Sequence, residues 1–123
     1  MTQENKELLL KDLCTRLPYH PRVKVWLKDG TTEEGTLDLE HNYGDVLRDA
    51  FYYNEIVKIK PYLFPMSSMT EEEKLMYEGL MIGTDNISYM LDVIDWLTAH
   101  HFDYRGLIDK SLALDATGLN IYN

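Results

Sequence analysis

Apolar residues near the N-terminus recur with the period of an α-helix. In the segment NKELLLKDLCTRL, five of them fall within one arc of a helical wheel, and Asp12 lies among the polar residues outside it. The five are Leu9, Leu10, Leu13, Cys14 and Leu17. This spacing predicts an amphipathic helix within residues 1–21 that buries Cys14. Pro18 and Pro21 end the helix, because proline cannot continue its hydrogen bonds.

A period-two alternation replaces the helical one over residues 22–63. The segment RVKVWLKDGTTEEGTLDLE places valines and leucines on one face, with Asp29-Gly30 as a turn signal. The opposite face of its first strand carries Lys24, Trp26 and Lys28. VLRDAFYY and EIVKIKPYL are rich in β-branched and aromatic residues and predict one or two further strands, and Pro61 and Pro65 close this region.

Residues 66–115 return to helical patterns. Thr70 is followed by three glutamates, and Thr70 with Glu73 forms a T-x-x-E capping box, which is typical of a helix start. This predicts a helix that runs toward Met81. The next segment, NISYMLDVIDWLTAH, has apolar residues around more than half of the helical circumference. We expect such a helix to be covered on more than one side.

The remaining segment, DYRGLIDKSLAL, predicts a short last helix, and residues 116–123 are expected to form a loose tail. At 123 residues the chain has the length of about one domain. We therefore expect a single α+β domain over residues 1–123. It would consist of an N-terminal helix, a small antiparallel or barrel-like sheet, and C-terminal helices packed on that sheet.

Negative charge is concentrated in the C-terminal half of the chain. The formal net charge is −9, and residues 61–123 carry ten acidic residues against three bases. That half would repel a phosphate backbone, so nucleic acid is not the expected partner. A protein with a basic surface fits the charge better.

Compartment signals point to the cytoplasm. No stretch approaches the roughly 20 apolar residues of a membrane span, and the N-terminus lacks the pattern of a signal or transit peptide. The single cysteine excludes an internal disulfide and suits a reducing compartment. We expect a cytoplasmic protein without membrane association.

The segment DWLTAHHFDYRGLIDK, from Asp95 to Lys110, gathers residue types that are common in active sites. Adjacent residues on a helix do not face each other, so the side chains of His100 and His101 should diverge. The i, i+4 spacing of a paired metal site is absent, as are the G-x-S-x-G and phosphate-binding glycine patterns. These observations argue against an enzyme, a metal site and a cofactor.

A purely structural interpretation of the same segment is a junction between two helices. In that interpretation Asp103 caps the last helix, Arg105 pairs with Asp103 or Asp109, and His101 points to the core. The functional interpretation is a binding edge, since tyrosine and arginine are enriched at binding hot spots and His100 projects toward a tryptophan. The candidate binding residues are Trp96, His100, Tyr104 and Arg105.

Two resemblances extend this picture. The strings KPYLFPMSSMTEEEK and DWLTAHHFDYRGLIDKSLAL, with LLLKDLCTRLPY, resemble uncharacterised small proteins of phages and mobile elements of gut anaerobic bacteria. This resemblance covers about a third to a half of the chain and implies a setting, not an activity. The ending LALDATGLNIYN departs from the acidic, proline-containing ending of that group.

The layout of residues 5–61 is also similar to that of Sm-like small barrels. A leading helix, a strand, Asp29-Gly30, a strand with Gly35-Thr36-Leu37 and a closing strand IVKIKP follow in that order. The resemblance implies a strongly bent sheet and strand pairing between subunits. The family's RNA-binding residues are not matched by LDLEHNYGD, and homo-oligomerisation is left open.

Three functions follow from these observations. The first is a non-enzymatic accessory protein that binds another protein through its acidic helical surface, in one form by inhibiting a host nucleic-acid-binding factor. The alternative is a small-ligand or nucleotide-binding protein with the four candidate residues in a pocket between sheet and helices. The third is an Sm-like RNA-binding module, which requires the bases of residues 23–60 to share one face. These bases are Lys24, Lys28, Arg48, Lys58 and Lys60.

Overall fold

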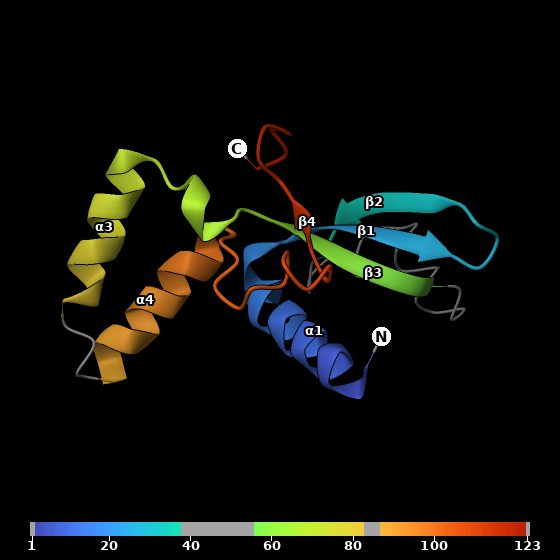
Figure 1. Cartoon of the computed structure of the whole chain (residues 1–123), viewed down its shortest axis with the longest axis horizontal. Coiled ribbons are helices and arrows are strands. Elements are labelled where there is room, and N and C mark those ends of the chain that lie inside the picture. Colours follow the sequence, from blue (N-terminus) through green and yellow to red (C-terminus); the bar gives the residue numbers. More distant parts are fainter. Residues whose placement is uncertain (1, 38–55, 83–86, 123) are drawn as a thin grey trace.

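The structure is a computed structural model that describes residues 2–37, 56–82 and 87–122 (Figure 1). An N-terminal helix is followed by a sheet and then by two further helices, which confirms the predicted α+β class. The described elements are α1 (Gln3–Arg16), the 3-10 helix η1 (Leu17–Tyr19), β1 (Arg22–Leu27), β2 (Thr32–Thr36), β3 (Ile56–Leu63), the 3-10 helix η2 (Met66–Ser68), α3 (Glu71–Met81), α4 (Ile87–Ala99) and β4 (Leu114–Asp115). The predicted strand VLRDAFYY lies outside the described residues.

The described strands form one open sheet in the order β2-β1-β3-β4. β1 pairs antiparallel with β2 and β3, whereas β4 pairs with β3 in parallel. The expectations of a purely antiparallel or barrel-like sheet are therefore wrong. Pro61 does not close β3, because it lies within the strand opposite Val23, at the point where the pairing of β3 passes from β1 to β4.

The hairpin between β1 and β2 turns at residues 28–31, which include the predicted turn signal Asp29-Gly30. Gly30 adopts a φ of 88°, a left-handed conformation that glycine accepts without steric cost. Asp29 accepts hydrogen bonds from the backbone N–H and the hydroxyl of Thr31. The second strand consequently begins at Thr32, and Gly35 is a paired strand residue opposite Val23.

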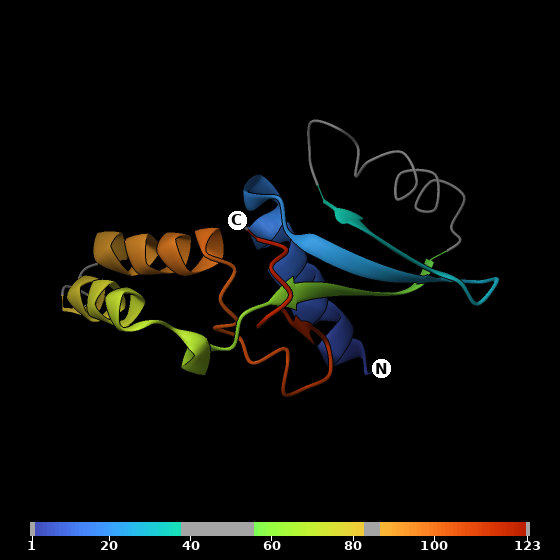
Figure 2. The ribbon, with the colours of Figure 1, turned by 90° about the horizontal axis from the view of Figure 1, so that it is seen from above.

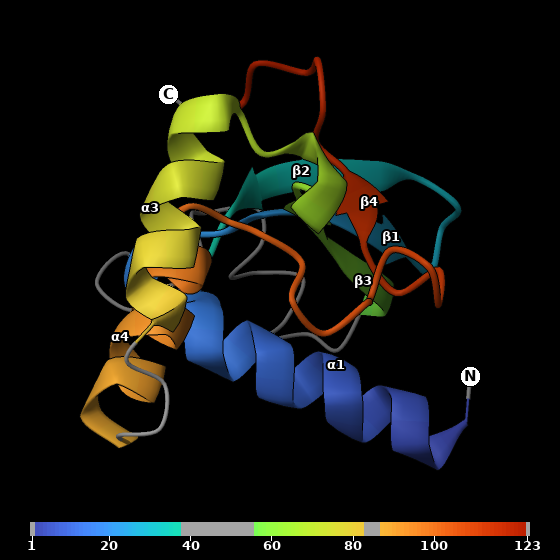
Figure 3. The ribbon, with the colours of Figure 1, turned by 60° about the vertical axis from the view of Figure 1, so that its left-hand side comes forward.

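Helix α1 lies across one face of the sheet (Figure 3). Leu9 and Leu13 pack on Val23 and Val25, and both valines are fully buried. The buried side of α1 is rotated from the predicted one: Leu10 and Cys14 are exposed, so the prediction of a core thiol is wrong. Two charged residues are buried instead. The apolar pattern placed Asp12 on the polar side and did not assign Arg16, and both are fully buried.

An ion pair between Asp12 and Arg16 explains this rotation. Both side chains have no exposed surface, and Arg16 Nε lies 2.7 Å from Asp12 Oδ2. Arg16 also donates a 2.8 Å hydrogen bond to the carbonyl of Phe102, and Arg105 lies 3.2 Å from the other oxygen of Asp12. A buried charge is stable only with such partners, so the corner at residues 102–105 fixes which side of α1 faces inward.

The predicted last helix is replaced by turns that lead into β4. The carboxylate of Asp103 accepts hydrogen bonds from the backbone N–H groups of Leu107 and Ile108 at 2.8 and 2.9 Å. Leu107 is fully buried beside Leu63 in a second core cluster. Asp103 thus caps a turn and not a helix, because burial of Leu107 and the pairing of β4 with β3 decide the local conformation.

The C-terminal tail is not loose, contrary to the prediction. Ala116 is fully buried, and the hydroxyl of Tyr122 accepts a hydrogen bond from the backbone N–H of Arg22 and donates one to the carbonyl of Tyr62. These bonds hold the tail against the start of β1 and the end of β3. The aromatic ring of Tyr122 also packs on Phe64, with ring centres 5.8 Å apart.

Helices α3 and α4 form a hairpin that projects away from the sheet (Figures 1 and 2). Thr70 and Glu73 make both hydrogen bonds of the predicted capping box at the start of α3. The hairpin meets the end of the sheet at a third core cluster, where Phe64 and Phe102 lie among residues of both helices. Most of its length has no cover from the rest of the described chain.

We expect Asp12→Ala to lower the free energy of unfolding by about 3 to 5 kcal/mol, because it leaves the guanidinium of Arg16 buried and unpaired. Asp12→Ala combined with Arg16→Met should cost less than the sum of the two single changes, since it removes the unpaired charge. Urea unfolding of the four proteins measures this coupling. Additive costs would show that the pair is not energetically linked.

Candidate functional site

The corner that follows α4 is pinned to the end of β3. The backbone N–H of Phe64 donates a 2.8 Å hydrogen bond to the carbonyl of His101. The carbonyl of Phe64 accepts one of 2.8 Å from the N–H of Asp103. The backbone N–H of Phe102 donates a 2.9 Å hydrogen bond to the carbonyl of Leu97 at the end of α4. His101 takes a φ of 63°, which a non-glycine residue adopts at an energetic cost. The tertiary contacts of this corner therefore hold an unfavourable backbone conformation.

Trp96 and His100 lie on the hairpin side of this corner. Their rings are 4.5 Å apart between centres, as the helical phase predicted. The His100 Nδ1 lies 2.8 Å from the carbonyl of Trp96. A carbonyl oxygen only accepts, so Nδ1 is the donor in this contact. Trp96 is half-buried against Phe102 and Tyr77, which makes it mainly a core residue.

Tyr104 and Arg105 face α1 instead. Arg105 pairs with Asp12, not with Asp103 or Asp109, and lies 3.5 Å from the hydroxyl of Thr15. Two guanidinium groups lie near the ring of Tyr104. The Cζ atoms of Arg16 and Arg105 are 5.3 and 5.0 Å from the ring centre. The four candidate residues thus form two pairs: Trp96 with His100, and Tyr104 with Arg105.

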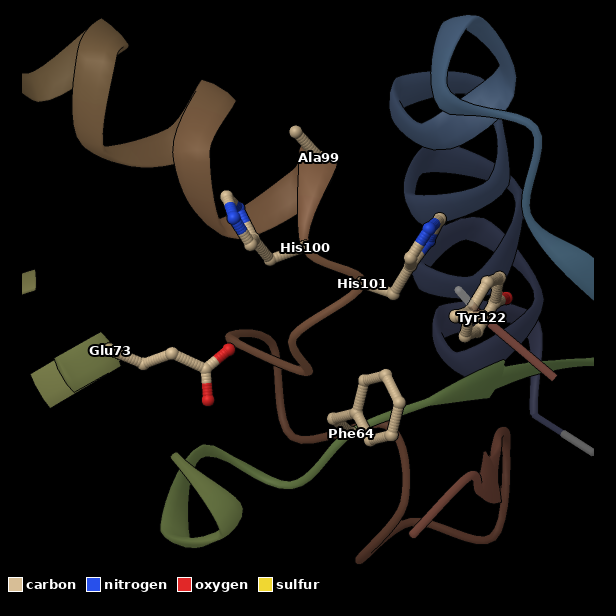
Figure 4. A pocket seen from close by; sticks show the side chains of 6 residues that line it. All are labelled: Phe64, Glu73, Ala99, His100, His101 and Tyr122. Atoms are coloured by element: carbon tan, nitrogen blue, oxygen red, sulfur yellow. The ribbon is translucent and has the colours of Figure 1, made fainter. Parts of the chain in front are cut away.

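A cavity of about 380 Å³ lies between the hairpin, the end of β3 and the C-terminal tail (Figure 4). Of the four candidate residues it includes only His100. Its lining consists of Phe64, Glu73, Ala99, His100, His101 and Tyr122. Figure 4 shows the His100 and Glu73 side chains on the same side of the cavity and the His101 ring lying on Tyr122. No sequence signal pointed to Tyr122, because the tail carries no periodic pattern.

His101 is an unusual group at the edge of this cavity. Its ring stacks on Tyr122 with centres 3.6 Å apart, and its Nδ1 is buried without a hydrogen-bond partner among the described residues. Burial lowers the pKa of His101 to about 4, and the positive charge of Arg16 adds to this effect. The imidazole is therefore neutral near pH 7, where it can accept a proton or a hydrogen bond but carries no charge.

The helical hairpin exposes an apolar stripe on α4, which we call the α4 stripe: Ile87, Met90, Leu91 and Ile94. Helical spacing places these residues on one side of α4, and the expectation that this helix is covered on more than one side is wrong for them. Ile87 is 76% and Leu91 58% exposed, because α3 packs on the neighbouring side through Val93 and Leu97. The two helices carry six acidic residues and a single base, Lys74.

The face of the sheet opposite α1 has the reverse charge. Cross-strand pairing places Lys24 opposite Lys60 and Trp26 opposite Lys58. All four alternate with Val23, Val25 and Ile59, which belong to the core cluster under α1. Arg22 belongs to the same side of β1 by alternation. The sequence predicted this for Lys24 and Trp26, but the partners from β3 are known only from the pairing register. Arg48 lies outside the described residues.

No group of three or more His, Cys, Asp or Glu side chains within residues 2–37, 56–82 and 87–122 is placed to hold a metal ion. No helix in the described part of the chain is long and apolar enough to cross a membrane. The chain matches no family model, no curated protein and no solved structure. The candidate surfaces are thus the cavity, the α4 stripe and the basic sheet face.

We expect the neutral His101 to make stability pH-dependent. Between the pKa of an unfolded histidine, about 6.5, and the folded value of about 4, the unfolded state binds a proton that the folded state excludes. Folding stability should therefore fall as the pH drops through this range, by about 1 to 2 kcal/mol after allowance for partial exposure. His101→Asn tolerates the positive φ and should remove this component. Urea unfolding from pH 7 to 4 tests this, and identical pH profiles for both proteins would contradict it.

Proposed function

We propose that the protein is a non-enzymatic binding module that engages another protein through the helical hairpin. The observation that carries this proposal is the α4 stripe, an apolar surface on an element that projects from the body of the molecule. Exposed apolar residues are common singly, but a contiguous patch rimmed by polar residues typically marks an interaction site. The hairpin has both features.

The spacing of the α4 stripe suits insertion into a groove. Ile87, Met90, Leu91 and Ile94 occupy positions i, i+3, i+4 and i+7, which is the anchor pattern of an amphipathic helix bound in an apolar groove. Four half-exposed side chains of this size offer on the order of 400 Å² of apolar surface, a substantial part of the roughly 800 Å² that each partner buries in a standard interface. The hairpin can supply the rest from α3.

The charge around the α4 stripe selects the kind of partner. Asp92 and Asp95 lie on the polar side of α4, and Glu71, Glu72 and Glu78 are exposed on α3. A partner with basic residues around an apolar groove would be attracted to this surface and an acidic one repelled. The resemblance to proteins of phages and mobile elements supports a bacterial cytoplasm as the setting of such a complex, with a host or phage protein as partner. Inhibition of a host nucleic-acid-binding factor is one form of it.

The cavity supports a second candidate function, the binding of a small ligand. Its volume is within the range of ligand sites, and it combines aromatic walls with the polar groups of Glu73 and His100. Its lining differs from the pocket expected from the sequence, since Arg105 is held by Asp12 and is not available to a ligand there. A ligand of this cavity would be uncharged or cationic beside Glu73.

The protein-binding function predicts a specific loss on polar substitution of the α4 stripe. Met90→Ser with Leu91→Ser should weaken binding to the partner by about 2 kcal/mol or more, which is at least tenfold in Kd, because both side chains would leave a desolvated contact. Leu10→Ser with Leu119→Ser is the matched control, since these residues are similarly exposed but lie on α1 and the C-terminal tail, outside the hairpin.

The partner would be captured from bacterial lysate at low and high salt, identified and purified, and its affinity measured for each variant by calorimetry. We expect a partner with a basic surface whose affinity falls as salt rises. An acidic partner, an affinity independent of salt, or equal losses in both double variants would contradict the proposal. Recovery of a bound small molecule with no protein partner would favour the cavity instead.

A further inference from the structure

The outward face of β1 and β3 concentrates positive charge on an otherwise acidic protein. We call this the basic sheet face and define it by Arg22, Lys24, Trp26, Lys58 and Lys60. Glu34, opposite Lys24 on β2, is the one acidic residue on this side of the described strands, and it accepts a hydrogen bond from the hydroxyl of Tyr62. The face therefore has a net positive charge although the chain has a net charge of −9.

This arrangement is unfavourable for the isolated protein. Lys24 and Lys60 are cross-strand partners, and like charges in directly opposite positions of an antiparallel pair repel each other. Lys58, two residues along β3, adds a third ammonium group beside them. A polyanion would relieve this repulsion, because it supplies negative charge to several of these side chains at once.

Trp26 lies at the centre of these bases. The ammonium nitrogen of Lys58 is 4.3 Å from the centre of the indole ring, that of Lys24 5.4 Å and that of Lys60 5.7 Å. Trp26 is only half-buried, and Lys58 is an exposed flexible side chain that can move from the ring to a phosphate. An accessible aromatic ring surrounded by cations is the combination that binds an unpaired base together with its flanking phosphates.

We propose that the basic sheet face binds single-stranded nucleic acid, with one base stacked on Trp26 and neighbouring phosphates paired with Arg22, Lys24, Lys58 and Lys60. Lysines two residues apart on β3 are about 6.6 Å apart along the strand, which lets successive phosphates of an extended strand meet successive cations. A duplex fits less well, because its paired and stacked bases are not free to stack on a tryptophan. An acidic protein would use the cations but not the ring.

The net charge of the chain does not prevent this binding. The expectation that nucleic acid is not a partner rests on the sum over the whole sequence, whereas the structure places acids on the projecting hairpin and bases on the sheet. Interactions between exposed charges are screened beyond about 8 to 10 Å at ordinary salt. The proposed site is also separate from the α4 stripe, so the two proposals stand or fall independently.

The experiment measures binding of a fluorescein-labelled oligothymidine of about 12 nucleotides by anisotropy at several salt concentrations. Three probes are compared: this oligonucleotide, an abasic strand of the same length, and polyglutamate. The variants are Trp26→Leu and Lys58→Gln, with Lys74→Gln on α3 as the matched control for the loss of one lysine. Far-UV circular dichroism and urea unfolding establish that each variant is folded.

We expect the oligonucleotide to bind more tightly than both other probes. Trp26→Leu should weaken its binding about tenfold and leave the abasic strand almost unaffected, since only the stacked base is lost. Lys58→Gln should reduce the slope of log affinity against log salt by about 0.7, which corresponds to one phosphate contact on a single strand. Lys74→Gln should change neither quantity.

Three results would overturn the proposal. They are the absence of binding at low salt, equal affinity for the oligonucleotide and the abasic strand, and an equal effect of Lys58→Gln and Lys74→Gln. Tighter binding of polyglutamate than of the oligonucleotide would also overturn it and would assign the basic sheet face to an acidic protein.

Discussion

The buried contact between Asp12 and Arg16 is the interaction on which the rest of the structure depends. It joins the middle of α1 to the corner after α4, because Arg16 also holds the carbonyl of Phe102 and Asp12 also holds Arg105. The same corner is bonded to the end of β3 through Phe64. Buried charges and backbone groups need hydrogen-bond partners, and although Arg16 Nη1 has none among the described residues, the other bonds of this network fix the relative positions of helix, sheet and hairpin.

This constraint has a consequence for function. Tyr104 and Arg105, which look like binding residues in the sequence, are committed to the network and hold the corner together. The hairpin is anchored at its base and projects from there, with its apolar stripe and acidic residues uncovered. The sheet, covered by α1 on one side, presents its bases on the other. The structure thus separates two surfaces of opposite charge, one on the hairpin and one on the sheet.

Local signals in the sequence were sufficient for several elements. The capping box at Thr70 and Glu73 forms as predicted, because the residues that satisfy the first backbone N–H groups of α3 are adjacent in the sequence. The contact between the rings of His100 and Trp96 follows from helical spacing alone. The alternation of β1 likewise placed its valines inward and Lys24 and Trp26 outward. Each of these predictions depends only on residues within about one turn or one strand.

The sequence by itself determined the α+β class, the start of α3 and the alternation of β1. The tertiary structure decided which side of α1 is buried. Asp12 enters the core and Cys14 leaves it because the partners of Asp12 include Arg105, far along the chain. The lysines of β1 and β3 surround one indole only because of the register of strand pairing. Such contacts join residues that are distant in sequence, and no local period encodes them.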